Sequence, residues 1–118
     1  MAGYSRQHLS GSTNGRAIKV AATATPGTAV HTAIAGTTGF DEVYLWASNT
    51  DSAERTLTVE WGGTTAPDDH VAPAITLPPN SGPVPIVTGQ CLNNGLAIKA
   101  FSDAANKVLL TGYVNRIS

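Results

Sequence analysis

Two stretches of the chain decide its fold class: VYLWAS at residues 43–48 and RTLTVEW at residues 55–61. Both show the alternation that places successive side chains on opposite faces of a β-strand. In the first stretch both faces are apolar, which predicts a central strand or a strand whose second face lies in an interface. In the second, apolar residues alternate with polar ones such as Glu60, which predicts one buried and one solvated face. Together the two stretches predict a hairpin with a long loop.

Short apolar runs of the same kind recur along the chain at about 8–12-residue spacing, which is typical of all-β domains. They cover residues 18–24, 29–35, 71–77, 84–87, 96–101 and 108–115. Turn residues separate the runs, and Asn93-Asn94-Gly95 is a strong tight-turn signal because Asn and Gly tolerate positive φ. Pro73 lacks a backbone N–H, so its strand is predicted either to lie at a sheet edge or to begin late. The pattern predicts one all-β domain over residues 17–118, an antiparallel β-sandwich or a jelly-roll-like barrel.

Residues 1–16 differ in texture from the rest of the chain. They are polar and rich in Gly, Ser, Thr and Asn, and only Tyr4 and Leu9 are sizeable apolar side chains. Such a segment cannot offset its own ordering entropy by burial. It is therefore predicted to be a flexible N-terminal arm, either disordered or ordered only against a partner.

The charge balance limits the possible partners. The 118 residues carry 13% charged side chains, about half the usual share, and the formal net charge is −1. The few basic residues are scattered, which argues against nucleic acid and anionic membranes as partners. No apolar run approaches the ~18 residues of a spanning helix. A surface with so little charge tends to associate, because little repulsion opposes contact.

Metal chemistry finds little support in the sequence. The histidines His8, His31 and His70 are far apart and show no ligand-pair spacing. A small metal enzyme of cupin-like architecture needs several such side chains converging from adjacent strands. Asp68 and Asp69 form a dense polar triplet with His70, but it lacks the spacing of a calcium loop. A solvated loop is the favoured interpretation, and no metal or other cofactor is expected.

Nucleophilic and acid–base catalysis are equally weakly supported. Cys91 is the only cysteine, and it is predicted to be a small buried hydrophobe. No G-x-S-x-G elbow and no phosphate-binding P-loop occur. A carboxylate pair would have to come from Asp41, Glu42, Glu54, Glu60 or the loop aspartates, and Glu60 is expected to face solvent or a partner. The sequence therefore predicts a protein that is not an enzyme.

A binding role remains, and the candidate contacts lie in the arm and in the strand at residues 43–48. The predicted interface residues are Tyr4, Arg6, His8, Leu9, Tyr44 and Trp46. Tyr44 and Trp46 are candidates because they occupy the second apolar face of their strand. Together with Trp61 and Tyr113 they could instead form a sugar-stacking platform. A purely structural alternative has Trp61 filling the core and the Tyr113 hydroxyl pinning the last strand.

Parts of the chain resemble small virion proteins encoded beside capsid genes in tailed bacteriophages. The resemblance covers about two thirds of the chain and rests on strand and turn texture. The matching pieces are VYLWASNT at residues 43–50, TLTVEWGG at 56–63, NGLAIKA at 94–100 and GYVNRI at 112–117.

This resemblance implies a structural, non-enzymatic protein of the virus particle. Capsid decoration (cement) proteins of this kind commonly sit as trimers over capsomer junctions, and several combine a β-sandwich with an extended terminal arm. The first expectation is therefore a decoration protein on the capsid surface, assembled in the host cytoplasm. Its partners would be the major capsid protein or another virion protein, and further copies of itself. A head–tail or tail component, and a carbohydrate-binding module, are the alternatives.

Overall fold

The computed structural model describes residues 3–118, which form nine strands and no helix, so none that could cross a membrane. The strands are β1 (Tyr4–His8), β2 (Ile18–Lys19), β3 (Thr28–Thr32), β4 (Phe40–Asn49), β5 (Arg55–Trp61), β6 (His70–Leu77), β7 (Val84–Leu92), β8 (Ala97–Ser102) and β9 (Val108–Ile117). The all-β prediction is confirmed.

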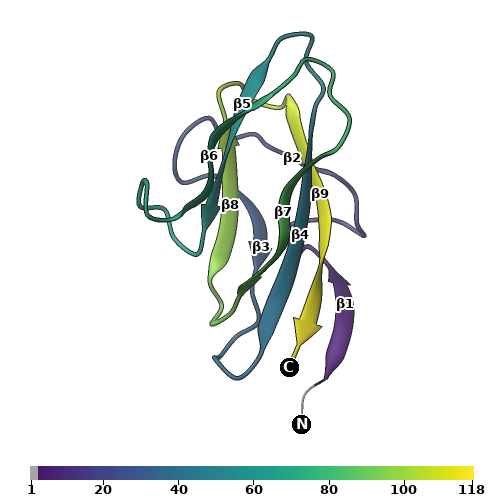
Figure 1. Ribbon diagram of the computed structural model, residues 1–118, viewed down its shortest axis with the longest axis vertical. Helices are drawn as coiled ribbons and strands as arrows, with labels where there is room; N and C mark the ends of the chain where they lie inside the picture. Colours follow the sequence, from purple (N-terminus) through teal and green to yellow (C-terminus); the bar gives the residue numbers. More distant parts are fainter. Residues whose placement is uncertain (1–2) are drawn as a thin grey trace.

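The strands form two antiparallel sheets that pack as a β-sandwich (Figure 1). The five-stranded sheet has the order β1-β9-β4-β7, and the two-residue strand β2 pairs with β9 beyond the end of β1. The four-stranded sheet has the order β3-β8-β5-β6. The strand β4 is central, as its two apolar faces predict. The strand β6 contains Pro73 and lies at an edge, the first of the two predicted alternatives; it does not begin late, because it starts at His70.

The core fills the space between the inner faces of the two sheets. Val43, Leu45 and Ala47 of β4 are completely buried, and they alternate with half-buried residues on the outer face. Leu57 and Val59 of β5 meet them from the other sheet. Trp61 is half-buried and packs against this core at its rim. The alternation of the sequence therefore predicts the inner faces correctly.

The predicted hairpin of residues 43–48 and 55–61 is wrong, because β4 and β5 belong to different sheets. The buried side chain of Asn49 explains the crossing. Its Nδ2 lies 2.9 Å from the carbonyl oxygen of Ala53 and 3.0 Å from that of Pro78. The amide thereby satisfies carbonyl groups where the chain leaves one sheet for the other. The predicted tight turn is confirmed: Asn94 and Gly95 have φ of 60° and 67°, and the turn also connects the two sheets.

The predicted flexible arm is also wrong for the described part of residues 1–16; residues 1 and 2 lie outside the described residues. The strand β1 pairs with β9 in a register that runs from Tyr4 opposite Ile117 to His8 opposite Tyr113. Leu9 follows and is buried in the core, with 1% of its surface exposed. The physical reason is that the end of β9 offers an unpaired edge, whose hydrogen bonds the short β1 completes.

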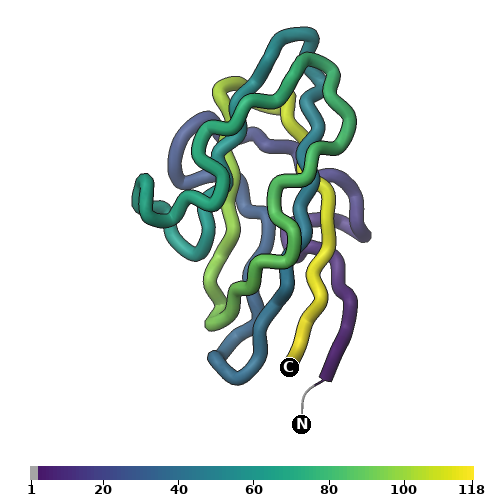
Figure 2. The backbone as a smooth tube through the Cα atoms, viewed as in Figure 1, coloured from purple at the N-terminus to yellow at the C-terminus, as the bar shows by residue number. Residues whose placement is uncertain are grey.

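The segment after β1 continues across the open side of the sandwich. The N–H of Gly11 donates to the carbonyl of Val30 in β3, at 2.9 Å, so this segment joins the edges of the two sheets. The ends of the described chain lie side by side in Figure 2, where Gly3 and Ser118 exchange backbone hydrogen bonds of 2.8 and 3.0 Å. The N-terminal residues are thus part of the sandwich.

Candidate interaction surface

Five of the six predicted interface residues lie on one surface, the outer face of the five-stranded sheet. Alternation on β1 places Tyr4, Arg6 and His8 on the same side, and alternation on β4 does the same for Tyr44 and Trp46. The strand β9 lies between them and aligns the two sets. Leu9 is the exception, because it turns into the core.

The centre of this face is an aromatic cluster, which we define as Tyr44, Trp46 and Tyr113. Tyr44 and Tyr113 are direct cross-strand partners, and their ring centroids are 4.9 Å apart with planes 19° from parallel. Trp46 lies 6.4 Å from Tyr44 and 6.0 Å from Tyr113. Aromatic cross-strand pairs of this kind stabilise a sheet, by roughly 0.5–1.5 kcal/mol per stacked pair. Tyr113 is not among the predicted interface residues; the sequence suggested it only for a sugar-stacking platform or for its hydroxyl group.

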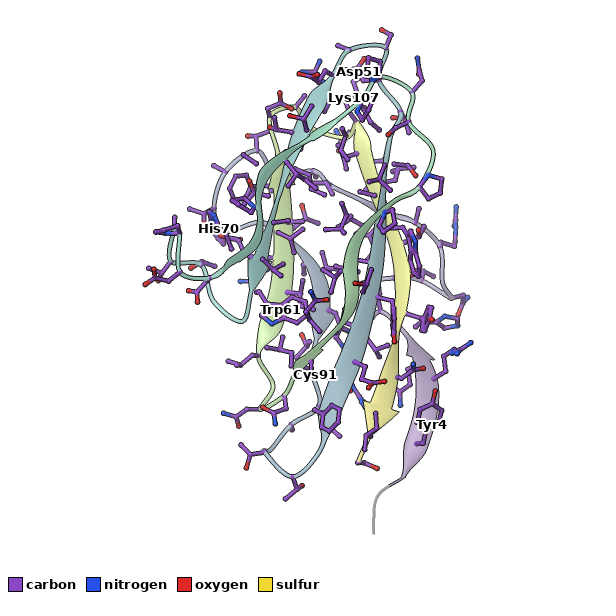
Figure 3. The ribbon with its side chains drawn as sticks, viewed as in Figure 1. Tyr4, Asp51, Trp61, His70, Cys91 and Lys107 are labelled. Atoms are coloured by element: carbon purple, nitrogen blue, oxygen red, sulfur yellow. The ribbon has the colours of Figure 1, made fainter. Side chains whose placement is uncertain are left out.

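Arg6 extends the cluster onto the edge strand. Its Cζ lies 4.6 Å from the centroid of the Tyr113 ring, and its Nε donates to Oδ1 of Asn115 at 3.3 Å. A guanidinium over a tyrosine ring is a cation–π contact. One residue from the N-terminal strand is therefore tied to the aromatic cluster that the central strands form. Tyr4, near the end of the same strand, leaves 66% of its surface exposed (Figure 3).

The ring geometry disfavours a sugar-stacking platform. Nearly parallel rings only 4.9 Å apart lie face against face, since rings side by side at that distance would overlap. Because β9 lies between β1 and β4, the Arg6 guanidinium and the Tyr44 ring approach Tyr113 from opposite sides, and together they cover its ring. Sugar stacking needs exposed ring faces. The packed rings form an apolar ridge, which is instead suited to contact with another protein surface.

Cys91 lies on the same outer face, opposite Glu42 of β4. It is exposed, so the prediction that it is a buried hydrophobe is wrong. The reason is that β7 runs on to Leu92 as an edge strand, where the sequence predicts its end at residue 87. Local desolvation and the charge of Glu42 raise the pKa of the Cys91 thiol. A raised pKa disfavours the thiolate, which is the nucleophilic form.

The inner side of the same sheet holds a buried ion cluster that sequence analysis missed. We define it as His31, Asp41 and Arg116, from β3, β4 and β9. Asp41 is fully buried, and its Oδ1 and Oδ2 accept from Nε and Nη2 of Arg116 at 2.8 and 2.9 Å. Nε2 of His31 lies 2.7 Å from Asp41 Oδ2. The cluster therefore links the two sheets at one end of the sandwich.

The sequence contains a signal for this cluster. Asp41 has the same parity as Val43 and Leu45 in its strand, so alternation places its carboxylate on the buried face. A buried carboxylate needs a partner. Arg116 is its direct cross-strand neighbour. That pairing depends on the β4–β9 register, which single-sequence analysis does not provide.

Ser10, His31 and Asp41 contain the residue types of a nucleophilic triad, but their geometry does not form one. Nδ1 of His31 accepts from the backbone N–H of Ser10 at 3.0 Å, and the proton on Nε2 is directed at Asp41. The Ser10 hydroxyl oxygen accepts from the N–H of Thr32 at 2.7 Å. Neither imidazole nitrogen is open to take a proton from the hydroxyl group. The contacts position the segment after β1.

The pKa of Asp41 makes this cluster a source of pH-dependent stability. Burial raises this pKa, but the hydrogen bonds from Arg116 and His31 and the charge of Arg116 outweigh burial and hold it below its ordinary value. A lowered folded-state pKa stabilises the fold above the unfolded pKa, about 3.9, and this contribution is lost as the pH falls. We expect the free energy of unfolding to fall from about pH 5 downward. For the Asp41→Asn variant, the free energy of unfolding, measured by urea denaturation at a series of pH values, should fall less steeply with decreasing pH. An unchanged dependence on pH would contradict the assignment.

Glu60 differs from its predicted solvated position. It is fully buried, and its carboxylate accepts from the Thr25 hydroxyl at 2.5 Å and the Gly27 N–H at 2.7 Å. Alternation places it on the outer face of the four-stranded sheet as predicted, but the segment that contains Thr25 and Gly27 folds over that face.

The polar triplet of Asp68, Asp69 and His70 is predicted to be a solvated loop. In the structure the Asp69 carboxylate accepts from the N–H of Thr65 at 2.9 Å.

Within residues 3–118, no group of three or more His, Cys, Asp or Glu side chains has the arrangement of a metal site. Comparison of the chain with protein-family models, with curated proteins and with solved structures gave no match. The residues of the outer face are therefore the basis for assigning a function.

Proposed function

We propose that this chain is a structural protein of a virus particle, and that it binds the outer surface of the capsid as a decoration protein. Its partner is the major capsid protein or another virion protein. It contacts that partner through the outer face of the five-stranded sheet. Its place in the cell is the virion, with assembly in the host cytoplasm.

The observation that carries this proposal is the convergence of two distant segments on one face. Arg6 of the N-terminal strand covers Tyr113, which in turn stacks on Tyr44 of the central strand. Interface centres are enriched in tyrosine, tryptophan and arginine, because these side chains bury large areas at low entropic cost. The resemblance to phage virion proteins and the low surface charge support the same function.

The physical role of such a protein requires no reacting group. A protein that binds only the assembled capsid stabilises that state by mass action. Trimerisation, which the resemblance implies, would strengthen weak contacts by raising their effective concentration. A sandwich with edges tied by the segment after β1 is also a rigid body, so little ordering entropy is lost on docking. Capsid binding by this mechanism predicts higher heat resistance of decorated particles.

The direct test mixes the purified chain with phage heads assembled without it. We expect binding and an increase in the temperature at which the heads open. The double variant Tyr44→Thr/Trp46→Thr should bind about thirtyfold or more weakly, as expected for interface aromatics worth roughly 2 kcal/mol or more. Binding is measured by co-sedimentation over a concentration series.

The matched control is Phe101→Thr, which removes a half-buried aromatic ring from the opposite sheet. It should leave binding unchanged, and the melting temperature of each variant reports whether its fold is intact. Heads that bind neither wild type nor control would remove the proposal. Equal weakening by both variants would move the contact away from the outer face.

The head–tail or tail component remains the second candidate, because the same face would serve it equally well. Binding to purified tails or connectors in place of heads would favour it. A carbohydrate-binding module is the third, and the covered faces of Tyr113 count against it. A glycan array that gives a signal abolished by Trp46→Thr would restore that candidate.

A further inference from the structure

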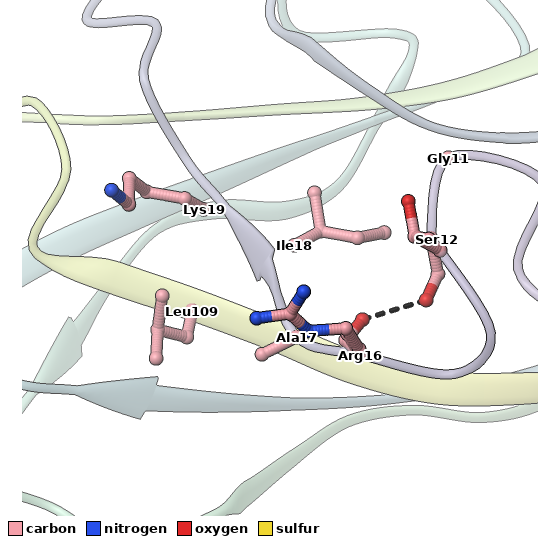
Figure 4. Close-up of a pocket in the computed structure, with 8 residues that line it drawn as sticks. Gly11, Ser12, Arg16, Ala17, Ile18, Lys19 and Leu109 are labelled. Carbon is pink, nitrogen blue, oxygen red and sulfur yellow. Dashed lines mark hydrogen bonds between the residues drawn. The ribbon is translucent and has the colours of Figure 1, made fainter.

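A groove of about 590 Å³ opens beside β2, where the chain returns to the five-stranded sheet (Figure 4). Its lining comes from two adjacent segments, residues 11–13 and 16–19, together with Leu109 of β9. Lys19 is the cross-strand partner of Leu109, so its side chain belongs to the outer face that carries the aromatic cluster. The groove is therefore continuous with the proposed interface.

The turn that forms one wall of the groove is well defined. Asn14 and Gly15 both have positive φ, 55° and 85°, and the N–H of Arg16 donates to the carbonyl of Thr13 at 3.0 Å. This is the geometry of a type I′ turn, which favours Asn-Gly at its centre. The Ser12 hydroxyl closes the turn further by donating to the carbonyl of Arg16 at 2.6 Å. Arg16 thus projects from a backbone that its own hydrogen bonds hold in place.

The groove carries a net positive charge. Arg16 and Lys19 line it, and no acidic side chain does. Within residues 3–118 the arginines that form ion pairs are Arg55 and Arg116, and neither Arg16 nor Lys19 takes part in one. The floor is apolar, from Ala17, Ile18 and Leu109. Two cations over an apolar floor are complementary to an extended segment that carries carboxylates and an apolar side chain.

The distribution of charge over the whole molecule indicates which class of anionic partner the groove fits. The outer face and this groove together hold three of the seven basic residues, Arg6, Arg16 and Lys19, but only one of the eight acidic residues, Glu42. Asp41 and Glu60 are buried, so the remaining surface carries four basic and five acidic residues and is nearly neutral. A long polyanion such as nucleic acid would find no continuous basic stripe beyond the groove, whereas a short acidic peptide segment needs none.

We propose that this groove binds an acidic, extended segment of the capsid partner, with its carboxylates at Arg16 and Lys19. This inference rests on the proposed function, since it names the chemistry of the partner. It implies that the contact is anchored by the aromatic cluster and oriented by the two cations. Charge complementarity at the rim of an interface acts mainly on orientation and association rate.

The test uses the full chain and the blocked peptide Glu-Val-Glu-Val-Glu, with Gln-Val-Gln-Val-Gln as the neutral counterpart. We expect the Glu peptide to shift the amide resonances of residues 11–13, 16–19 and 109 at low salt, and to bind at least fivefold more weakly at 0.3 M NaCl. The Arg16→Gln/Lys19→Gln variant should lose at least fivefold in affinity. Lys99→Gln/Lys107→Gln, which removes the same charge elsewhere, should not.

Three results would overturn the inference. The first is equal shifts by the Gln peptide, and the second is shifts confined to other residues. The third is tighter binding of inorganic phosphate or of a single-stranded oligonucleotide than of the Glu peptide. Head binding separates this inference from the proposed function. Heads that bind the groove variant as well as wild type would remove only the inference, whereas a chain that binds the peptide but no head would remove only the proposed function.

Discussion

Replacing Asp41 with alanine is expected to destabilise the fold by about 3–5 kcal/mol, the usual cost of removing one partner from a buried ion pair. The carboxylate is fully buried and receives hydrogen bonds from Arg116, His31 and the N–H of Ile34, the last at 3.2 Å. Its removal leaves the buried Nε2 proton of His31 and the guanidinium without their acceptor. Unpaired buried donors carry the full cost of desolvation.

The free energy of unfolding in urea at pH 7 measures this effect. The control is Asp68→Ala, an exposed loop carboxylate whose removal should change stability by no more than about 0.5 kcal/mol. Because His31 also accepts from the N–H of Ser10, Asp41→Ala should loosen the segment after β1, and amide exchange at Ser10 and Gly11 should accelerate. A loss below about 1 kcal/mol would mean that the cluster contributes little to stability.

The second large effect is expected at Gly112, in the middle of β9. A Cβ added there would collide with the carbonyl oxygen of Tyr44 and lie 3.2 Å from the Cα of Leu45. Both are backbone atoms of the central strand β4, so no side-chain rotation can relieve the contact. Gly112→Ala should therefore cost about 3 kcal/mol, at the upper end of overpacking effects.

This substitution also tests how the site depends on the fold. The forced separation of β4 and β9 would pull Tyr44 away from Tyr113, so the near-ultraviolet circular dichroism of the aromatic cluster should weaken. Gly82→Ala is the matched control, because an added Cβ there meets no atom within 4 Å and the residue has no positive φ. A Gly112→Ala variant as stable as Gly82→Ala would show that the two strands can separate at little cost.

Much of the candidate site follows from alternation alone. The parity of Tyr44 and Trp46 in their strand assigns them to the face opposite Leu45, and the structure places them there. The N-terminal contribution does not follow in the same way. Residues 4–8 bury little apolar surface of their own, so their composition resembles that of a disordered arm. Their order depends on the hydrogen bonds of an edge that another strand, more than 100 residues away, provides.

The burial of charged residues also cannot be predicted from the local sequence pattern. Glu60 has the sequence environment of a solvated strand face, and only the segment that contains Thr25 and Gly27 makes it a buried acceptor. Asp41 is assigned to the inner face by parity, but its partners come from strands distant in sequence. Covering segments and cross-strand partners are long-range features, and a local pattern carries no information about them.

The amino-acid sequence by itself determined the all-β class, the inner faces of the strands and the tight turn at Asn94-Gly95, because period-two alternation and positive-φ residues act over a few neighbouring residues. Only the tertiary structure decided that β4 and β5 lie in different sheets, that β1 completes the edge of β9, and that Arg6 meets Tyr113. Those outcomes depend on which strand edges remain unpaired once the core has packed, and this is a property of the whole chain.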